Sequence, residues 1–442
     1  MRRRDNWSQH LIDTTTDSTQ PFAGIRVVEF GQFVAVPFCA QLLAEGGARV
    51  VKIEALEGDP TRRLQQWAPN ETRIFISRNR GKHSLPLNLR APGARPVIAA
   101  LLRWADVALM NFRPGLAEQL GLDAATLCGA HPRLIVGSVS AFGSRGQEAD
   151  LAGMDIVVQA RTGLMAANGR TVDGRPAAGD PVSADYMCAM SLAFGVASAL
   201  LRRERTGRGG AVEMSLMKAA MTLANNQLVR SELHDRPQHD EALKRLAALR
   251  ARGASYQEQV DAMPSARAMP MMKVYFRTYE TADAAIAIAC GSHSLREKFA
   301  AVVGFADPAL NVMSTRGWDE HYDRLRGELE ALMKSRPSAQ WIALLNDAGV
   351  PVSGVKLPLE LFDDPQAEAN GMFHMLEHPT VGGVKVLSPP VVLDGDGFMP
   401  GAPTAAFGSE TDAILRELGF ADGEIDGLLN ANVTHRLDVT QP

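Results

Sequence analysis

Short runs of β-branched residues alternate with helix-prone stretches through the first half of the chain, and this alternation constrains the fold more than any other feature. A strand is expected at residues 25–30, a helix at 37–45 closed by Gly46 and Gly47, and a second strand at 49–54. Parallel strands need a crossover connection, usually a helix, so a strand, a helix and a strand in this order predict a parallel unit.

The same alternation continues for another 150 residues or so. We expect further strands at 84–89, 106–112, 134–142 and 212–216, and helices at 93–104, 185–203 and 217–233. This order predicts an open, mostly parallel α/β sheet. Ligands of such sheets bind beyond the carboxyl ends of the strands, which lie here near Gly31, Asn111 and Phe142.

A chain of 442 residues is too long for one ordinary core, so more than one domain is expected. Residues 274–279 and 284–289 resemble a hairpin of a second, smaller α/β unit, and a charged helical insert precedes it. The predicted boundaries are a loose tail at 1–20, a large domain at 21–230, an insert at 231–268, a small domain at 269–350, and a return segment at 351–442 that completes the large domain.

The bulk composition argues for a cytoplasmic protein. The net charge of -4 gives no reason to expect nucleic acid or an anionic membrane as the partner. Four scattered cysteines without a CxxC pair indicate a reduced compartment, and each is most simply a small core residue. The polar N-terminus lacks the apolar stretch of a signal peptide, and we expect no segment long and apolar enough to cross a membrane.

Several common catalytic signatures are absent. The first expected strand is followed by Gly31-Gln32-Phe33-Val34-Ala35, which is not the glycine fingerprint of a nicotinamide enzyme. The sequence also lacks a P-loop, a GxSxG nucleophile elbow and a metal-binding histidine pair. We therefore expect no bound metal and no permanently bound cofactor.

Asp185 stands near the expected start of a long helix, in the segment from Gly179 to Tyr186. Its simplest role is to cap that helix, because aspartate is preferred at this position. A carboxylate there would also be expected to stay ionised, as a nucleophile must. Two basic turns, residues 78–82 and 111–115, would suit a phosphate or an adenine, although such turns are more often solvated loops.

Taken together, the motifs resemble those of the family III CoA-transferases, which also include the formyl-CoA transferases and the α-methylacyl-CoA racemases. Each motif is weak alone, but their order and spacing match over nearly the whole chain after residue 20. The matching segments are Gly24–Phe30, Val50–Glu54, Gly58–Arg62, Asn79–Ser84, Ala105–Val107, Asn111–Gly115, Leu120–Leu122, Pro132–Ile135, Ser138–Gly143, Thr206–Gly210, Val212–Leu216, Ala348–Pro351, Asp364–Gln366 and Gly408–Asp412.

This resemblance implies a Rossmann-like large domain, a smaller α/β domain and an interlocked homodimer. It makes Asp185 the nucleophile, which would take CoA from an acyl-CoA as an aspartyl thioester and pass it to a free carboxylic acid. CoA and its thioesters are then substrates. The resemblance places CoA contacts at Val34, Ala35, Leu87, Arg90, Asn111, Phe112, Arg113, Gln119, Ser140 and Phe142.

The chain departs from the family pattern at several positions, and alternatives stay open. The formyl-CoA enzymes have glutamine at the position of Val34, an arginine at that of Gln119 and a glycine run at 269–273, so we expect a larger or branched acid rather than formate or oxalate. The racemases use a histidine where Met154 stands, and methionine cannot carry a proton. A racemase and a non-catalytic acyl-CoA-binding protein remain as alternatives.

Overall fold

The computed structural model describes residues 19–263, 269–312 and 317–437. The predicted tail at 1–20 lies outside this range except for its last two residues. The chain forms two compact units, one made of residues up to 229 together with 371 onward, and one of residues 230–370. In this division residues 231–268 and 351–370 belong to the second unit.

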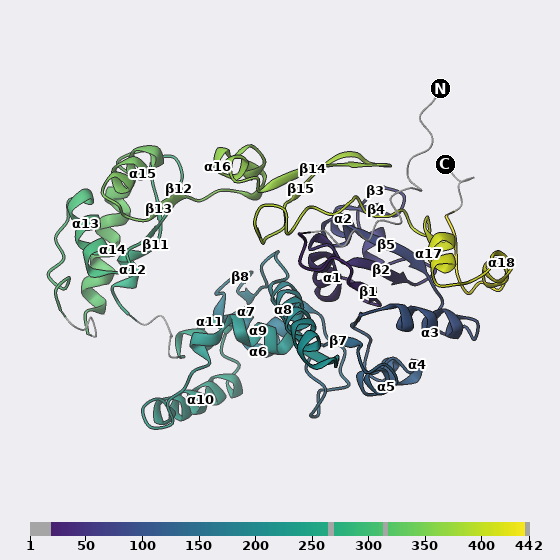
Figure 1. Ribbon diagram of the computed structural model, residues 1–442. Helices are drawn as coiled ribbons and strands as arrows, with labels where there is room; N and C mark the ends of the chain where they lie inside the picture. The colour runs from purple at the N-terminus through teal and green to yellow at the C-terminus, as the bar shows by residue number, and fades with distance from the viewer. Residues whose placement is uncertain (1–18, 264–268, 313–316, 438–442) are drawn as a thin grey trace. The chain divides into compact units, whose positions relative to one another are not determined.

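The larger unit is built on a six-stranded sheet whose strand pairs are all parallel, in the order β10-β7-β6-β1-β2-β5 (Figure 1). The prediction of a parallel α/β sheet is confirmed. Numbered along the chain, this is the 3-2-1-4-5-6 order of doubly wound sheets, whose direction of progression reverses between β1 and β6. The strands are β1 (Arg26–Glu29), β2 (Arg49–Glu54), β5 (Lys82–Pro86), β6 (Val107–Met110), β7 (Ile135–Ser140) and β10 (Gly210–Ser215).

Both faces of this sheet are buried, because successive strand residues point to opposite sides. Val27 packs into one apolar cluster and Val28 into the other. The first cluster is formed with α1 (Ala35–Glu45), α6 (Asp155–Thr162), α8 (Ser183–Thr206) and α9 (Leu216–Leu223). The second is formed with α3 (Ala94–Trp104), α5 (Ala124–Ala130), α17 (Thr411–Glu417) and α18 (Asp422–Asn430).

Shorter elements complete the larger unit. They are η1 (Pro60–Arg63), β3 (Gln66–Ala68), β4 (Glu71–Thr72), α2 (Arg73–Asn79), α4 (Leu116–Leu120), α7 (Leu164–Ala167), β8 (Thr171–Val172), β9 (Arg175–Pro176), η2 (Asn225–Gln227), and the antiparallel hairpin of β14 (Phe373–His378) and β15 (Gly382–Leu387).

The second unit contains a three-stranded antiparallel sheet, which includes the predicted hairpin. Its strands are β11 (Phe276–Glu280), β12 (Ala285–Ala289) and β13 (Val352–Gly354). Its helices are α10 (Arg236–Ala251), α11 (Tyr256–Asp261), α12 (Met272–Tyr275), α13 (His293–Val303), α14 (Asp319–Met333), α15 (Ser338–Asp347), η3 (Pro358–Asp363) and α16 (Pro365–Ala369).

Helix α8 corrects one expectation from the sequence. By length and composition it could cross a membrane, with a mean hydropathy of 1.5 over its most apolar window. It packs in the core instead of standing free, since Cys188, Leu192 and Val196 are fully buried. Where it crosses β10, a Cβ on Gly195 would lie 2.6 Å from Val212. Packing against the sheet thus accounts for the apolar residues on one side of α8, whereas Met190, Phe194 and Leu201 are exposed.

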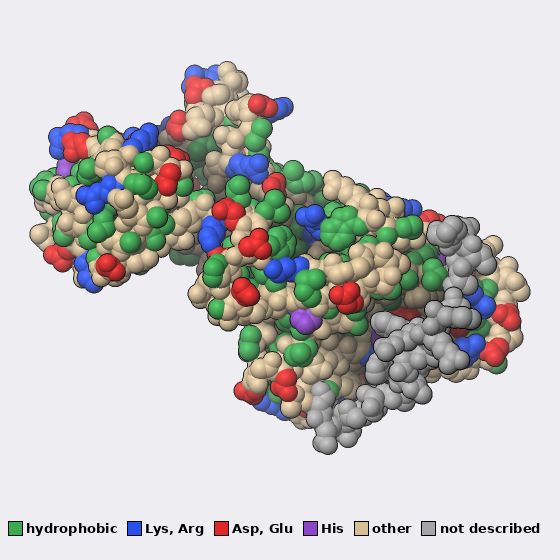
Figure 2. Space-filling model, turned by 90° about the horizontal axis from the view of Figure 1, so that it is seen from above, with side chains coloured by type: hydrophobic (Ala, Val, Ile, Leu, Met, Phe, Trp, Pro, Cys, Tyr) green, Lys and Arg blue, Asp and Glu red, His purple; other side chains and the backbone are tan. Residues whose placement is uncertain are grey.

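Two other predictions about secondary structure were wrong. The helix expected to reach residue 233 ends at Leu223, where a short 3₁₀ turn over polar residues Asn225–Gln227 follows. The turn expected over the basic stretch 78–82 is shorter than predicted, because α2 ends at Asn79, only residues 80 and 81 form the turn, and β5 begins at Lys82. On the face seen in Figure 2, acidic and basic side chains are intermixed instead of gathered by sign, as the small net charge suggests.

Candidate active site

Asp185 lies in the first turn of α8, and its side chain is half-buried. Among the described residues its carboxylate has neither a hydrogen-bond donor nor an ion-pair partner. Buried carboxylates are normally paired, because desolvation of an unpaired charge is costly. A half-buried carboxylate without a partner pays part of this cost, which makes Asp185 a candidate for a functional role.

The cap of α8 is provided by Asp155, not by Asp185. Asp155 is the first residue of α6 and is buried. Its Oδ1 accepts hydrogen bonds from the backbone N–H of Ala184 (2.8 Å) and of Asp185 (3.2 Å), while its Oδ2 accepts from Gln159 (2.5 Å). The predicted capping role of Asp185 was wrong, and this frees its side chain for chemistry.

The protonation of Asp185 also differs from the expectation. Burial, and next the negative charge of Asp155, raise its pKa to about 7, while the guanidinium of Arg78 partly opposes them. The expectation that the helix terminus alone would keep this carboxylate ionised was wrong, because desolvation outweighs it. A carboxylate with a pKa near neutrality is partly ionised and more basic than an ordinary aspartate.

Arg78 and two aromatic rings surround this part of α8. Arg78, from the last turn of α2, donates from Nε to the Tyr186 hydroxyl at 3.3 Å, and its guanidinium carbon lies 5.6 Å from the centre of that ring. The Tyr186 ring in turn meets Phe38 of α1 edge to face, with 5.0 Å between the ring centres. Three separate elements therefore fix the surroundings of Asp185.

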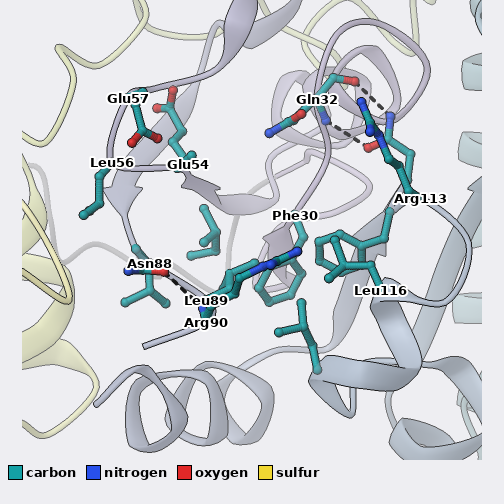
Figure 3. Close-up of a pocket in the computed structure, with 16 residues that line it drawn as sticks. Phe30, Gln32, Glu54, Leu56, Glu57, Asn88, Leu89, Arg90, Arg113 and Leu116 are labelled. Atoms are coloured by element: carbon teal, nitrogen blue, oxygen red, sulfur yellow. Dashed lines mark hydrogen bonds between the residues drawn. The ribbon is translucent and has the colours of Figure 1, made fainter. Parts of the chain in front are cut away.

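A pocket of about 440 Å³ lies at the carboxyl ends of β1, β2, β5 and β6, where sequence reasoning expects a ligand. Figure 3 shows Arg90 and Arg113 among its lining residues, with Glu54 and Glu57 on another side. Five of the predicted CoA contacts line it, namely Leu87, Arg90, Asn111, Phe112 and Arg113. Two arginines beside apolar side chains would suit a phosphorylated ligand with a flat ring.

The other predicted CoA contacts lie outside this pocket. Gln119 lines an adjoining groove together with Arg90, and Phe142 lines a separate one beside α9. Val34 and Ala35, at the start of α1, have buried side chains. The Ser140 hydroxyl accepts a hydrogen bond from the N–H of Gly143. All of these assignments remain predictions.

The amide of Asn111 is already used within the protein. Its Oδ1 accepts from the backbone N–H of Gln32 (3.0 Å), and its Nδ2 donates to the Gln32 carbonyl (2.9 Å). These two bonds are the dashed lines beside Gln32 in Figure 3. This pair joins the ends of β1 and β6 across the point where the strand order reverses. It also steadies a strained loop, since the next residue, Phe33, has a φ of 67°. The sequence did not indicate this positioning role.

The same loop is held from within the core by two buried lysines. Lys52 donates to the carbonyl of Gly31 and Lys82 to that of Pro37, each at 2.7 Å. Both lysines pair with buried Glu29, at 3.0 and 2.8 Å. The sequence signal was present, because Lys52 and Lys82 belong to motifs that carried the family resemblance.

The basic stretch 78–82 does not offer a phosphate site of three cations. Arg80 pairs with Glu45 at 2.7 Å in the core, and Lys82 is buried on Glu29. Only Arg78 keeps a guanidinium that forms no ion pair within the described residues. Among all residues that the structure describes, no group of three or more histidine, cysteine, aspartate or glutamate residues could hold a metal ion.

Comparison with known proteins gives the family. Residues 22–407 match the model of CoA-transferase family III. The chain is 30% identical over 404 residues to the acetyl-CoA:oxalate CoA-transferase of Acetobacter aceti, covering 90% of this chain and 95% of that protein. It is 26% identical to the mouse succinyl-CoA:glutarate CoA-transferase, covering 94% and 91%.

Solved structures agree with this result. The crystal structure of Rv3272 from Mycobacterium tuberculosis matches with a TM-score of 0.71 and 26% identity, covering 89% of this chain and 98% of that one. A CAIB/BAIF family protein from Brucella suis matches with a TM-score of 0.69 and 27% identity, covering 90% and 99%. The protein belongs to the family III CoA-transferases, and it is an enzyme that acts on CoA thioesters.

Proposed function

We propose that the protein transfers CoA from an acyl-CoA to a free carboxylic acid through a thioester formed on Asp185. The observation that carries this proposal is the half-buried Asp185 carboxylate, which has no partner among the described residues and a pKa raised to about 7. An unpaired, partly desolvated carboxylate is the state in which this weak nucleophile attacks best.

The reaction needs no group beyond the substrates and this carboxylate. Asp185 attacks the thioester carbonyl of the donor, CoA thiolate leaves, and a mixed anhydride forms. The thiolate then attacks the Asp185 carbonyl of the anhydride, which releases the donor's acid and leaves the aspartyl-CoA thioester. The acceptor acid repeats these steps in reverse.

The pocket at the strand ends is our proposed site for CoA. Arg90 and Arg113 would meet its phosphates, and Leu87 and Phe112 its adenine. Contacts far from the reacting atoms can supply binding energy that positions the thioester. The loop held by Asn111, Lys52 and Lys82 would then present its backbone at a fixed place.

Trapping of the covalent intermediate tests the proposal. The protein is incubated with a panel of acyl-CoA donors, hydroxylamine is added, and the tryptic peptides are weighed. A hydroxamate on the peptide that carries Asp185 is the expected result. A modification on another carboxylate, or none with any donor, would contradict it.

The acceptor is proposed to be a larger or branched carboxylic acid. Val34 and the Met269–Met272 segment stand where the formyl-CoA enzymes have a polar side chain and glycines, which favours a less polar acid. Relatives named for oxalate, glutarate and phenyllactate define a useful panel of acids. Transfer to oxalate in preference to all larger acids would contradict this part of the proposal.

Racemase activity is disfavoured by the structure of α6. Met154, which precedes the capping Asp155, is exposed and offers no group that could exchange a proton. Incorporation of solvent deuterium at the α-carbon of an acyl-CoA, without exchange of acids, would favour the racemase instead.

We also propose a homodimer in a reduced, cytoplasmic setting. All four cysteines are free thiols. Large apolar side chains are exposed along one unit, including Met190, Phe194 and Leu201 of α8, and Phe194 is 76% exposed. Such surface is commonly covered by a partner. A monomeric mass in light scattering at micromolar concentration would contradict the dimer.

A further inference from the structure

We propose that Arg78, together with the Tyr186 hydroxyl, binds the carboxylate of the acceptor acid beside the thioester on Asp185. This inference rests on the proposed function and adds a binding site for the second substrate. It gives a role to Arg78, the one cation of the 78–82 stretch that forms no ion pair among the described residues.

The arrangement leaves donors free for a carboxylate. Arg78 uses only its Nε, which donates to Tyr186, and neither of its terminal nitrogens has a partner among the described residues. Two parallel N–H groups of a guanidinium match the two oxygens of a carboxylate. The Tyr186 hydroxyl accepts from Arg78 and keeps its own hydrogen to donate.

The guanidinium is also held in place before any substrate arrives. The hydrogen bond from its Nε and its contact with the Tyr186 ring orient the guanidinium. Phe38 of α1 packs edge to face with that ring. Because Tyr186 follows Asp185 directly in α8, the cation is tied to the same helical turn as the nucleophile. A preorganised cation costs less to use than one that must be ordered on binding.

The charge of Asp185 decides when the site can be filled. In the free enzyme, burial and the charge of Asp155 raise the pKa of Asp185, and attraction by the Arg78 guanidinium lowers it in part. A second carboxylate would be repelled by that charge. Once Asp185 is a neutral thioester, Arg78 lacks this counter-charge and can attract the acceptor. The acceptor acid should therefore bind after CoA has been loaded, which gives an ordered exchange.

The chemical step then balances without an added proton. A carboxylate oxygen of the acceptor attacks the thioester carbonyl of Asp185, and the carbon–sulfur bond breaks with its electron pair on sulfur. The CoA thiolate attacks the acceptor's carbonyl carbon in the anhydride. The bond to the Asp185 oxygen breaks, and the Asp185 carboxylate is restored. One negative charge is present throughout, and Arg78 stays beside it.

The test compares Arg78→Ala with Arg73→Ala, its matched control. Arg73 lies on the same helix but is exposed and stacks on Trp67. Steady-state KM values are measured for donor and acceptor at about pH 9, where Asp185 is ionised in every variant. Hydroxamate trapping with the donor alone is measured in parallel.

For Arg78→Ala we expect the acceptor KM to rise roughly 10- to 100-fold, as when a charged hydrogen-bonding partner is lost. The donor KM should change less than about threefold, since CoA contacts are elsewhere. Inhibition by the released acid should weaken in parallel, because that acid leaves through the same site. Added methylguanidinium should restore part of the acceptor affinity, and Arg73→Ala should resemble the wild type.

Three outcomes would overturn the inference. One is an unchanged acceptor KM, and another is a rise of the donor KM as large as that of the acceptor. The third is a loss of adduct with the donor alone, which would make Arg78 a positioning residue for Asp185. If Arg78→Ala does not fold, Arg78→Lys can replace it. Arg78→Lys keeps the positive charge but lacks the two parallel N–H groups, and it should give an intermediate acceptor KM. Failure of the wild type to form an adduct would instead refute the proposed function itself, so the two failures can be told apart.

Discussion

Two groups of carboxylates in the larger unit, one fully buried and one at the half-buried start of α8, have opposite surroundings. Below the loop that follows β1, Glu54 accepts two hydrogen bonds from Arg62, at 2.7 and 2.9 Å, and Asp59 pairs with Lys52 at 3.0 Å. At the start of α8, Asp185 has no such partner among the described residues and lies near a second carboxylate, Asp155.

The pKa values follow from this difference. Burial alone would raise the pKa of Glu54, but Arg62, Lys52 and Ser84 together outweigh it and the pKa is lowered. For Asp185 burial prevails, and the pKa rises to about 7. Glu71 shows that burial can do this within the ion cluster as well, because its contacts with Arg62 at 3.2 Å and Thr404 at 3.0 Å still leave its pKa raised to about 7. Glu71 is buried, however, whereas Asp185 is partly exposed. In our proposal, the paired carboxylates stabilise the fold and the unpaired carboxylate of Asp185 is the nucleophile.

The largest expected effect is on turnover. Asp185→Asn keeps the size of the side chain but cannot form the thioester, so transfer should fall by at least about 10⁴-fold. Acyl-CoA binding, measured by calorimetry, should change little because the strand-end pocket is untouched. Substantial residual transfer by this variant would place the nucleophile elsewhere.

Breaking the paired group should damage stability instead. Glu54→Gln leaves the buried Arg62 guanidinium without its bidentate partner, and the free energy of unfolding should fall by about 3 to 5 kcal/mol. Urea titration measures this loss. As a control, Asp422→Asn disrupts an exposed ion pair with Arg416 and should be indistinguishable from the wild type. Equal stabilities of the two variants would contradict a structural role for the cluster.

Asp185→Asn should have the opposite effect on stability. The pKa of Asp185 is raised by folding, so its favourable contribution is present at low pH and is lost as the pH rises from about 4 through about 7. Relative to the wild type, Asp185→Asn should therefore gain stability over this range. Above it the gain should level at roughly 2 kcal/mol, reduced by solvent screening. Thermal unfolding at several pH values measures the gain, and a destabilised variant at about pH 8 would contradict the assignment.

A smaller effect is expected from the capping residue. Asp155→Asn keeps the Oδ1 acceptor for Ala184 and Asp185 but removes the charge that helps to raise the pKa of Asp185. The pH midpoint of transfer should move down, and the rate at about pH 6 should rise about two- to threefold. Asp155→Ala loses the cap as well and should also lower the unfolding free energy by about 1 kcal/mol.

The sequence predicted the sheet well because its strands are local and apolar on both faces. Arg90, Asn111 and Arg113, which the family resemblance implied as CoA contacts, line one pocket at the carboxyl ends of the strands, and their role in binding stays a prediction. The end of α9 was missed, because apolar periodicity continues into the residues after Leu223 although the backbone does not stay helical.

The relation between Asp155 and Asp185 could not be read from the sequence. The two residues are far apart in the chain, and their contact depends on how α6 packs against α8. For the same reason the sequence could not show which cations of the 78–82 stretch would form ion pairs in the core. Side-chain partners across elements, and the pKa values they set, come only with tertiary structure.

The most direct test is the rate of formation of the Asp185 adduct as a function of pH, in a single turnover with donor alone. The account predicts a hydroxylamine-trapped product on the Asp185 peptide, with a rate that rises through a midpoint at about 7. A midpoint near that of an ordinary aspartate, or a rate that does not vary between about pH 5 and about pH 9, would contradict it.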